Sequence, residues 1–158
     1  QVLKRELLNI PVFGWALRMI KPIAINRAQP KQALRQVAEQ GAARLEKGNW
    51  LLIFPEGTRV PPGKIGKFSR GGASLAAHAG LPVLPVAHNA GQFWPKFDWR
   101  KVPGTIDVVI GPPMLAEGTD LAAIAELNQR AFLWVAQAQH EIGSLTDENW
   151  QVIKEQAD

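Results

Sequence analysis

Short apolar runs alternate along the chain with a segment in which apolar residues recur at helical spacing. Residues 22–27 and 50–54 each have the length and composition of a buried strand. Between them, over 31–46, apolar side chains return every three or four positions, which indicates an amphipathic helix; they are Leu34, Val37, Ala38, Ala42 and Leu45. A strand, a helix and a strand in this order predict a βαβ unit with parallel strands and a right-handed crossover.

The remaining sequence continues the alternation. A small-residue helix is predicted over 69–79, a strand over 83–88 with a break at Pro85, and a second strand over 105–110. Thr119 suits a helix N-cap and Asp120 the first turn of a long helix that ends near His140. Its apolar side is predicted to contain Leu121, Ile124, Ala125, Phe132 and Val135.

These elements predict an α/β fold, with a mixed, mostly parallel sheet flanked by helices. The expected domain covers 1–142, and 143–158 forms a polar tail, either a short helix or a frayed end. Residues 1–21 are expected to be irregular or to form short helical turns. Because the first residue is Gln1 rather than Met, we expect the chain to begin inside a longer protein.

The composition excludes several kinds of site. The 158 residues include no cysteine, so a disulfide framework, a thiolate metal site and a cysteine nucleophile are ruled out. No apolar run is long enough to cross a bilayer. Charge is uneven, with 16 Lys and Arg against 6 Asp and Glu in 1–107, and 2 against 8 in 108–158. The first part therefore offers a basic surface to an anion, or simply a solvated one.

The segment 54–59 places polar groups directly after a predicted strand. Arg59 can bind a phosphate through two parallel N–H donors, and Gly57 lets backbone N–H groups approach an anion. Thr58 can add a hydroxyl donor, whereas Glu56 would be repelled by phosphate and is expected to orient Arg59 or to accept from a substrate hydroxyl. A turn held by a Glu–Arg pair is the alternative.

Phe-Pro-Glu-Gly-Thr-Arg at 54–59 resembles the signature of the glycerolipid acyltransferases, the family of 1-acyl-glycerol-3-phosphate acyltransferases. Three further parts of the family pattern follow the same order. Lys4 precedes a Pro-x-Phe-Gly turn, a short strand ends at Arg27, and a basic, glycine-containing segment occupies 66–72. The strand at 81–86 is similar to the last block, so the resemblance covers about 1–115.

The resemblance implies a fold of the glycerol-3-phosphate acyltransferase type. It also implies transfer of a fatty acyl group from acyl-CoA or acyl-carrier protein to lysophosphatidic acid, with no metal and no further cofactor. Lys4 and Arg27 would join the segment 56–59 around the substrate phosphate, and Lys67 and Arg70 would add basic groups. The expected location is a membrane surface, on the cytoplasmic face.

The catalytic block of this family, a His followed five positions later by Asp, has no counterpart here. The residues five positions after His78, His88 and His140 are Val83, Phe93 and Leu145. We therefore expect the dyad to lie before Gln1 and the 158-residue chain alone to be inactive. His88, near a strand end, is the candidate for a substitute base, although such a ring is more often satisfied by nearby backbone or, here, by Asn89.

Aromatic and basic residues are interleaved over 92–101. Trp94, Phe97 and Trp99 with Lys96, Arg100 and Lys101 could lie at a membrane interface, stack on single-stranded bases or pack on the edge of the core. No RNA-binding signature accompanies them, so no nucleic-acid partner is expected. A non-catalytic phospholipid-binding module remains the alternative to an enzyme.

Overall fold

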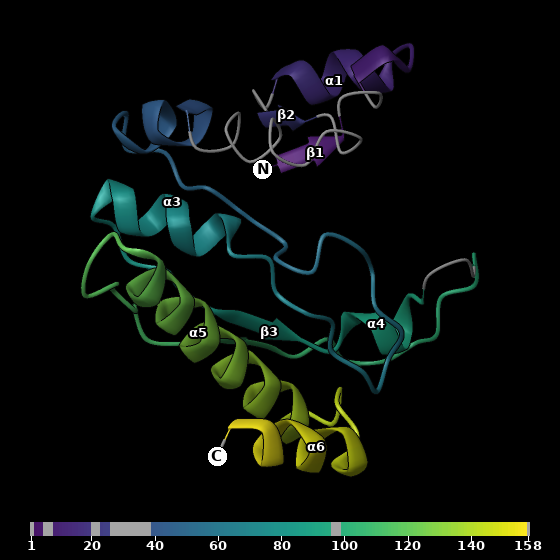
Figure 1. Ribbon diagram of the computed structural model, residues 1–158. Coiled ribbons are helices and arrows are strands. Elements are labelled where there is room, and N and C mark those ends of the chain that lie inside the picture. The colour runs from purple at the N-terminus through teal and green to yellow at the C-terminus, as the bar shows by residue number, and fades with distance from the viewer. Residues whose placement is uncertain (1, 5–7, 20–22, 26–38, 96–98, 158) are drawn as a thin grey trace. The chain divides into compact units, whose positions relative to one another are not determined.

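A computed structural model describes residues 2–4, 8–19, 23–25, 39–95 and 99–157 (Figure 1). The chain divides into two compact units, an N-terminal unit of residues 1–55 and a C-terminal unit of residues 56–158.

The N-terminal unit contains a short parallel strand pair. Strands β1 (Val2–Lys4) and β2 (Ile23–Ile25) pair in parallel, with Val2 opposite Ile23, and helix α1 (Phe13–Met19) lies between them in the sequence. The predicted strand within 22–27 is thus confirmed. Strand β1 was not predicted, because three residues followed directly by charged ones carry too little apolar pattern.

The connection to the C-terminal unit differs from the prediction. Residues 39–45 are helical, as expected, but 50–54 pair with no described strand, so the predicted strand there was wrong. Their side chains do alternate, with Leu51 and Ile53 half-buried and Trp50 82% exposed. An apolar run specifies extended backbone but not a partner, and a strand exists only where a neighbouring edge supplies hydrogen bonds.

The C-terminal unit is built from an antiparallel strand pair and helices (Figure 1). Val86 pairs with Ile110, and Val83 bridges Met114 farther along, so the predicted interruption at Pro85 is confirmed. At the other end of the strand pair, Asn89 Nδ2 donates to the Asp107 carboxylate, and Asn89 Oδ1 accepts the Asp107 N–H. The elements are α3 (Gly71–Ala79), β3 (Val86–His88), α4 (Ala90–Phe93), β4 (Val108–Ile110), α5 (Leu121–Glu141) and α6 (Asp147–Ala157).

Helix α5 organises the core of this unit. It packs against α3, β3 and α6 (Figure 1), and Leu127 in its middle is 1% exposed. Alanines of α3 lie against Leu127 and Ala131, and small side chains at such a contact let two helices approach closely. Of the predicted apolar side, Ile124 and Val135 are buried, whereas Leu121 is exposed.

Helix α5 begins one residue later than predicted. Asp120, not Thr119, is the N-cap, and its carboxylate accepts hydrogen bonds from the N–H groups of Ala122 at 2.8 Å and Ala123 at 2.9 Å. Because these donors favour the charged carboxylate, the pKa of Asp120 lies below its ordinary value. Asp and Ser or Thr are similarly good caps, so sequence alone did not distinguish the two neighbours.

The predicted polar tail is a helix. Its residues 147–157 form α6, which packs on α5. The described part of the chain thus has α/β character, with a parallel strand pair in one unit and an antiparallel pair in the other, each accompanied by helices. The boundary at residue 142 stays a prediction.

Candidate functional site

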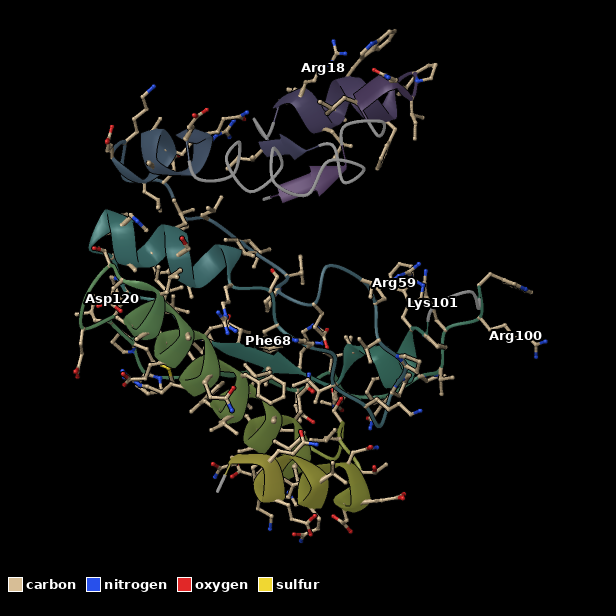
Figure 2. The ribbon with its side chains drawn as sticks, in the orientation of Figure 1. Arg18, Arg59, Phe68, Arg100, Lys101 and Asp120 are labelled. Atoms are coloured by element: carbon tan, nitrogen blue, oxygen red, sulfur yellow. The ribbon has the colours of Figure 1, made fainter. Side chains whose placement is uncertain are left out.

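Arg59 lies in an exposed loop at the start of the C-terminal unit. Gly57 has φ of +68°, a backbone conformation that favours glycine, and it turns the chain between Glu56 and Arg59. In Figure 2 the Arg59 side chain extends away from the core that Phe68 enters. Among the described residues none is paired with Arg59. Its guanidinium is therefore available to an anion.

Glu56 closes this loop at its base. Its Oε1 accepts the N–H of Gly66, ten residues along, at 2.5 Å. A Cβ on Gly66 would lie 2.9 Å from Val60 Cγ2 and 3.1 Å from Glu56 Oε1, so the clasp needs glycine there for space. In the structure the Glu56 carboxylate accepts from the loop backbone. The two expected roles of Glu56, orienting Arg59 and accepting from a substrate hydroxyl, stay predictions.

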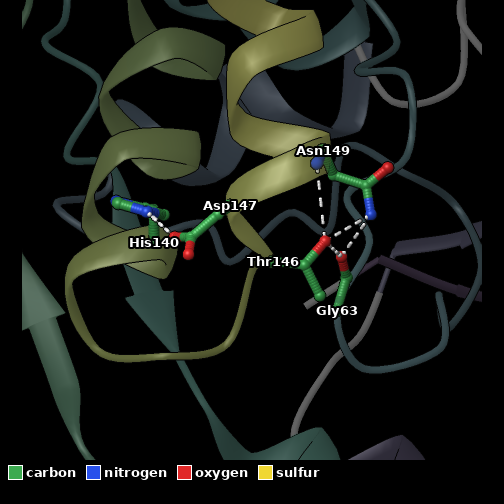
Figure 3. A network of polar contacts seen from close by, with 5 residues as sticks. All are labelled: Gly63, His140, Thr146, Asp147 and Asn149. Atoms are coloured by element: carbon green, nitrogen blue, oxygen red, sulfur yellow. Dashed lines mark hydrogen bonds and ion pairs between the residues drawn. The ribbon is translucent and has the colours of Figure 1, made fainter.

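The middle of the loop is fixed to the turn between α5 and α6. Gly63 donates its N–H to the Ser144 carbonyl at 2.9 Å. Its own carbonyl accepts from Thr146 and Asn149, as Figure 3 shows for the side chains. The loop of residues 56–66, which we call the Arg59 loop, is thus held both at its base and in its middle.

The other predicted basic residues are placed unequally. Lys67 and Arg70 are exposed, and Arg70 is the N-cap of α3. Between them Phe68 packs edge-on against Phe132, with ring centroids 5.2 Å apart. Lys4 ends β1 in the other unit, and Arg27 lies outside the described residues, so their grouping with Arg59 stays a prediction.

The three histidines each have a backbone or carboxylate partner. His88 Nδ1 accepts the N–H of Ala90 at 3.3 Å. With Nδ1 as the acceptor, the proton of the neutral ring is on Nε2, so neither nitrogen has a free lone pair to take up a proton. His78 Nδ1 lies 2.8 Å from the Ser74 carbonyl, and His140 Nε2 lies 2.7 Å from Asp147 Oδ1. His88 as substitute base is therefore not favoured by this geometry. Within the described ranges, no three His, Asp or Glu side chains gather as metal ligands would.

In the aromatic and basic segment 92–101, residues 92–93 end α4, and residues 94–95 and 99–101 lie outside helices and strands. The Val102 N–H donates to the Phe93 carbonyl at 2.9 Å. Lys101 Nζ lies 4.1 Å from the centroid of the Trp94 ring, a cation–π contact. Trp94 is 58% and Trp99 87% exposed, so neither ring is packed into the described core. None of the helices in the described part of the chain combines the length and apolar character of a membrane span.

Comparison with known proteins decides the family. A family model described as "Acyltransferase" matches residues 1–89, more than half of the chain and including the Arg59 loop. The chain belongs to the acyltransferase family. The resemblance seen at 54–59 is therefore confirmed. Residues 56–59 of this signature form the first part of the Arg59 loop.

Several relatives carry more specific names. The acyltransferase chain is 66% identical over 145 residues to the 1-acyl-sn-glycerol-3-phosphate acyltransferase of Pseudomonas aeruginosa, covering 92% of this chain and 56% of that protein. It is 31% identical over 138 residues to the human 1-acyl-sn-glycerol-3-phosphate acyltransferase alpha, covering 85% of this chain and 49% of the relative.

A solved structure supports the fold. The crystal structure of the 1-acyl-sn-glycerophosphate acyltransferase PlsC from Thermotoga maritima matches with a TM-score of 0.73 and 28% identity. The match covers 92% of this chain and 57% of that one. The predicted fold of the glycerol-3-phosphate acyltransferase type is thus confirmed, and the chain spans a little over half the length of the first relatives named here.

The acyltransferase chain also contains contacts that the sequence did not reveal. Thr146 and Asn149, which hold Gly63, lie in the segment predicted as a polar tail. A signal was present, since Thr146 followed three positions later by a polar side chain is typical of a helix N-terminus. Nothing in the local pattern, however, indicates a contact with a residue more than 80 positions away.

Proposed function

We propose that the complete protein transfers a fatty acyl group to 1-acyl-glycerol-3-phosphate and so forms phosphatidic acid. The observation that carries the proposal is the 66% identity to a protein named for this reaction, over a range that includes the Arg59 loop. The exposed guanidinium of Arg59, without a partner among the described residues, suits the phosphate of such an acceptor.

In this proposal the chain supplies the phosphate site and another part of the protein supplies the base. Arg59, with Lys4 and Arg27, binds the phosphate and so places the free hydroxyl within reach of a His–Asp dyad. The His removes the hydroxyl proton and the alkoxide oxygen forms the ester bond as the thioester breaks. The thiolate of CoA or of the carrier protein leaves and takes up the proton. Such positioning contributes several orders of magnitude to a rate, and the reaction needs no metal or further cofactor.

The membrane surface is the proposed location, on its cytoplasmic face, because the product is a membrane lipid. Residues 94–95 and 99–101, which we call the Trp loop, have features that suit this surface. Its tryptophans are exposed and Lys101 lies over one of them. Tryptophan rings favour the headgroup level of a bilayer, and basic side chains are attracted to anionic lipids.

A phospholipid-binding module that has the phosphate site but no base is the second candidate. No His-x-x-x-x-Asp pattern occurs within the 158 residues, and its absence from the sequence upstream of Gln1 would favour this candidate. The two proposals differ in turnover, not in binding.

An acyl-transfer assay tests the choice. The complete protein is incubated with lysophosphatidic acid and either acyl-CoA or acyl-carrier protein, and the 158-residue chain alone is assayed in parallel. We expect phosphatidic acid from the complete protein with at least one donor and none from the chain alone. Lipid binding without turnover in the complete protein would favour the module, and turnover by the chain alone would contradict a dyad outside it and return attention to His88.

A further inference from the structure

We infer that Asn149, in the first turn of α6, is a positioning residue for the phosphate of the acceptor. It acts through the carbonyl of Gly63 and so holds the Arg59 loop in place. The inference rests on the proposed function, because it assigns Arg59 to the substrate phosphate.

The contact at Gly63 is dense. The Gly63 carbonyl accepts from Asn149 Nδ2 at 2.8 Å, from the Thr146 N–H at 3.2 Å and from Thr146 Oγ1 at 3.3 Å (Figure 3). The Gly63 N–H donates to the carbonyl of Ser144, a buried residue. Gly63 has φ of +84°, and a Cβ there would lie 3.1 Å from Thr146 Cγ2. Both backbone groups of Gly63 are therefore committed to the turn that joins α5 to α6.

The anchor lies close to Arg59 along the chain. Gly63 lies four positions after Arg59, and two of the three intervening residues are Pro61 and Pro62, whose rings fix φ. On the other side, Glu56, whose carboxylate accepts the Gly66 N–H, lies three positions before Arg59. A shift of Gly63 is thus passed to Arg59 through a short, stiff segment rather than absorbed by a long loop.

The amide of Asn149 is chemically suited to this task. Thr146 caps α6, because its Oγ1 accepts the Asn149 N–H at 3.4 Å and its carbonyl accepts the Trp150 N–H. Asn149 therefore occupies the third helical position, where a capping box has Glu or Gln reaching back to the backbone of the cap. A carboxylate there could not donate to a carbonyl, whereas the Asn149 NH₂ donates to both Gly63 and Thr146 Oγ1.

Because an amide donates and a carboxylate does not, one substitution at Asn149 can remove the contact with Gly63 without weakening helix α6. Asn149→Asp keeps the size of the side chain and adds a negative charge in the first turn of α6, which favours the helix, but it removes the donor to Gly63. Gln151→Glu makes the same amide-to-acid change two residues later, at an exposed position, and is the matched control.

Two measurements on the complete protein test the inference. Hydrogen–deuterium exchange over residues 59–68 should be faster in N149D than in wild type and in Q151E. The KM for lysophosphatidic acid should rise about three- to tenfold in N149D, the loss expected for one hydrogen bond to a held carbonyl, with the KM for the acyl donor unchanged. A role in stability alone would not separate the two KM values.

Unchanged exchange in N149D would overturn the anchor, and faster exchange with an unchanged KM would overturn the positioning role. If the wild-type protein transfers no acyl group, the proposed function fails and the positioning role with it, while the exchange result still decides separately whether Asn149 holds the loop.

Discussion

His140 Nε2 lies 2.7 Å from Asp147 Oδ1, so a histidine at the end of α5 is joined to the first residue of α6. The imidazole also stacks on Trp150, with ring centroids 5.7 Å apart and an angle of 25° between the planes. The side chain of His140 is 30% exposed and that of Asp147 is 95% exposed. This His–Asp pair lies at the junction of α5 and α6, and we expect it to stabilise the packing of α6 on α5.

A double-mutant cycle measures that role. The variants His140→Ala and Asp147→Ala, singly and together, should give a coupling free energy of about 0.2–1 kcal/mol in urea unfolding, since the pair is exposed to solvent. Acyl transfer by the complete protein should persist in both single variants. Loss of turnover in His140→Ala with unchanged stability would instead make this pair catalytic.

The cap of α5 predicts a dependence of stability on pH. Hydrogen bonds from Ala123 and Ala122 lower the pKa of Asp120, so the folded protein holds this carboxylate in its charged form more strongly than the unfolded chain does. The stabilisation is therefore present above the pKa of an unfolded Asp, about 3.9, and is lost as the pH falls through the lower folded pKa. Asp120→Ala should be less stable than wild type at pH 7, and the gap in urea midpoint should narrow as the pH falls below 4.

Asp120→Asn is the control for this measurement, because an amide also caps a helix but does not titrate in this range. The narrowing on acidification should appear for wild type against Asp120→Asn as well. A gap between wild type and Asp120→Ala that is equally wide at pH 3 and pH 7 would show that the charge of Asp120 contributes nothing.

Arg59 is expected to dominate binding of the acceptor. In the complete protein Arg59→Ala should raise the KM for lysophosphatidic acid and lower kcat/KM by about 1.5–3 kcal/mol in transition-state stabilisation, or roughly 10- to 150-fold. Arg59→Lys should fall between the two, because one ammonium cannot replace two parallel N–H donors. Lys64→Ala, an exposed cation of the same loop, is the matched control. Equal effects of Lys64→Ala and Arg59→Ala would mean that only loop charge matters.

A charge reversal in the Trp loop tests whether this loop binds the membrane, and a second Lys–Trp pair in α6 provides the control. Lys101 lies 4.1 Å above Trp94, and Lys154 lies 5.6 Å above Trp150 on the acidic helix α6. If the Trp loop faces the bilayer, Lys101→Glu should weaken binding to phosphatidylcholine vesicles containing phosphatidylglycerol by about tenfold or more, since each basic residue near the surface is worth about 1 kcal/mol. Lys154→Glu should have little effect, and equal losses in co-sedimentation would argue against the assignment.

The sequence predicted the elements whose signals are local. The long helix α5, the small-residue helix α3 and the strands interrupted at Pro85 were all visible in periodicity and in turn residues, and 54–59 identified the family. Strand β1 is not predictable from the sequence because it is only three residues long. The apolar run 50–54 predicts a strand that does not form, because such a run does not reveal whether a neighbouring strand edge exists.

Only the local features of the candidate site were predictable from the sequence. The exposed Arg59 and the turn at Gly57 follow from neighbouring residues, whereas the clasp between Glu56 and Gly66 and the anchor at Gly63 depend on how distant segments fold together. The prediction that Lys4 and Arg27 join Arg59 remains to be tested.

The hydrogen bond between Gly63 and Asn149 joins residues that are 86 positions apart in the chain. A ribosome adds about 5–20 residues per second, so roughly 4–17 s pass between synthesis of the two partners. During that interval the nascent chain already contains Arg59 and the Glu56–Gly66 contact but cannot yet form the anchor at Gly63. The anchor at Gly63 can therefore form only after α6 has been synthesised, and a chain that stops before α6 would carry the signature of its family without this anchor.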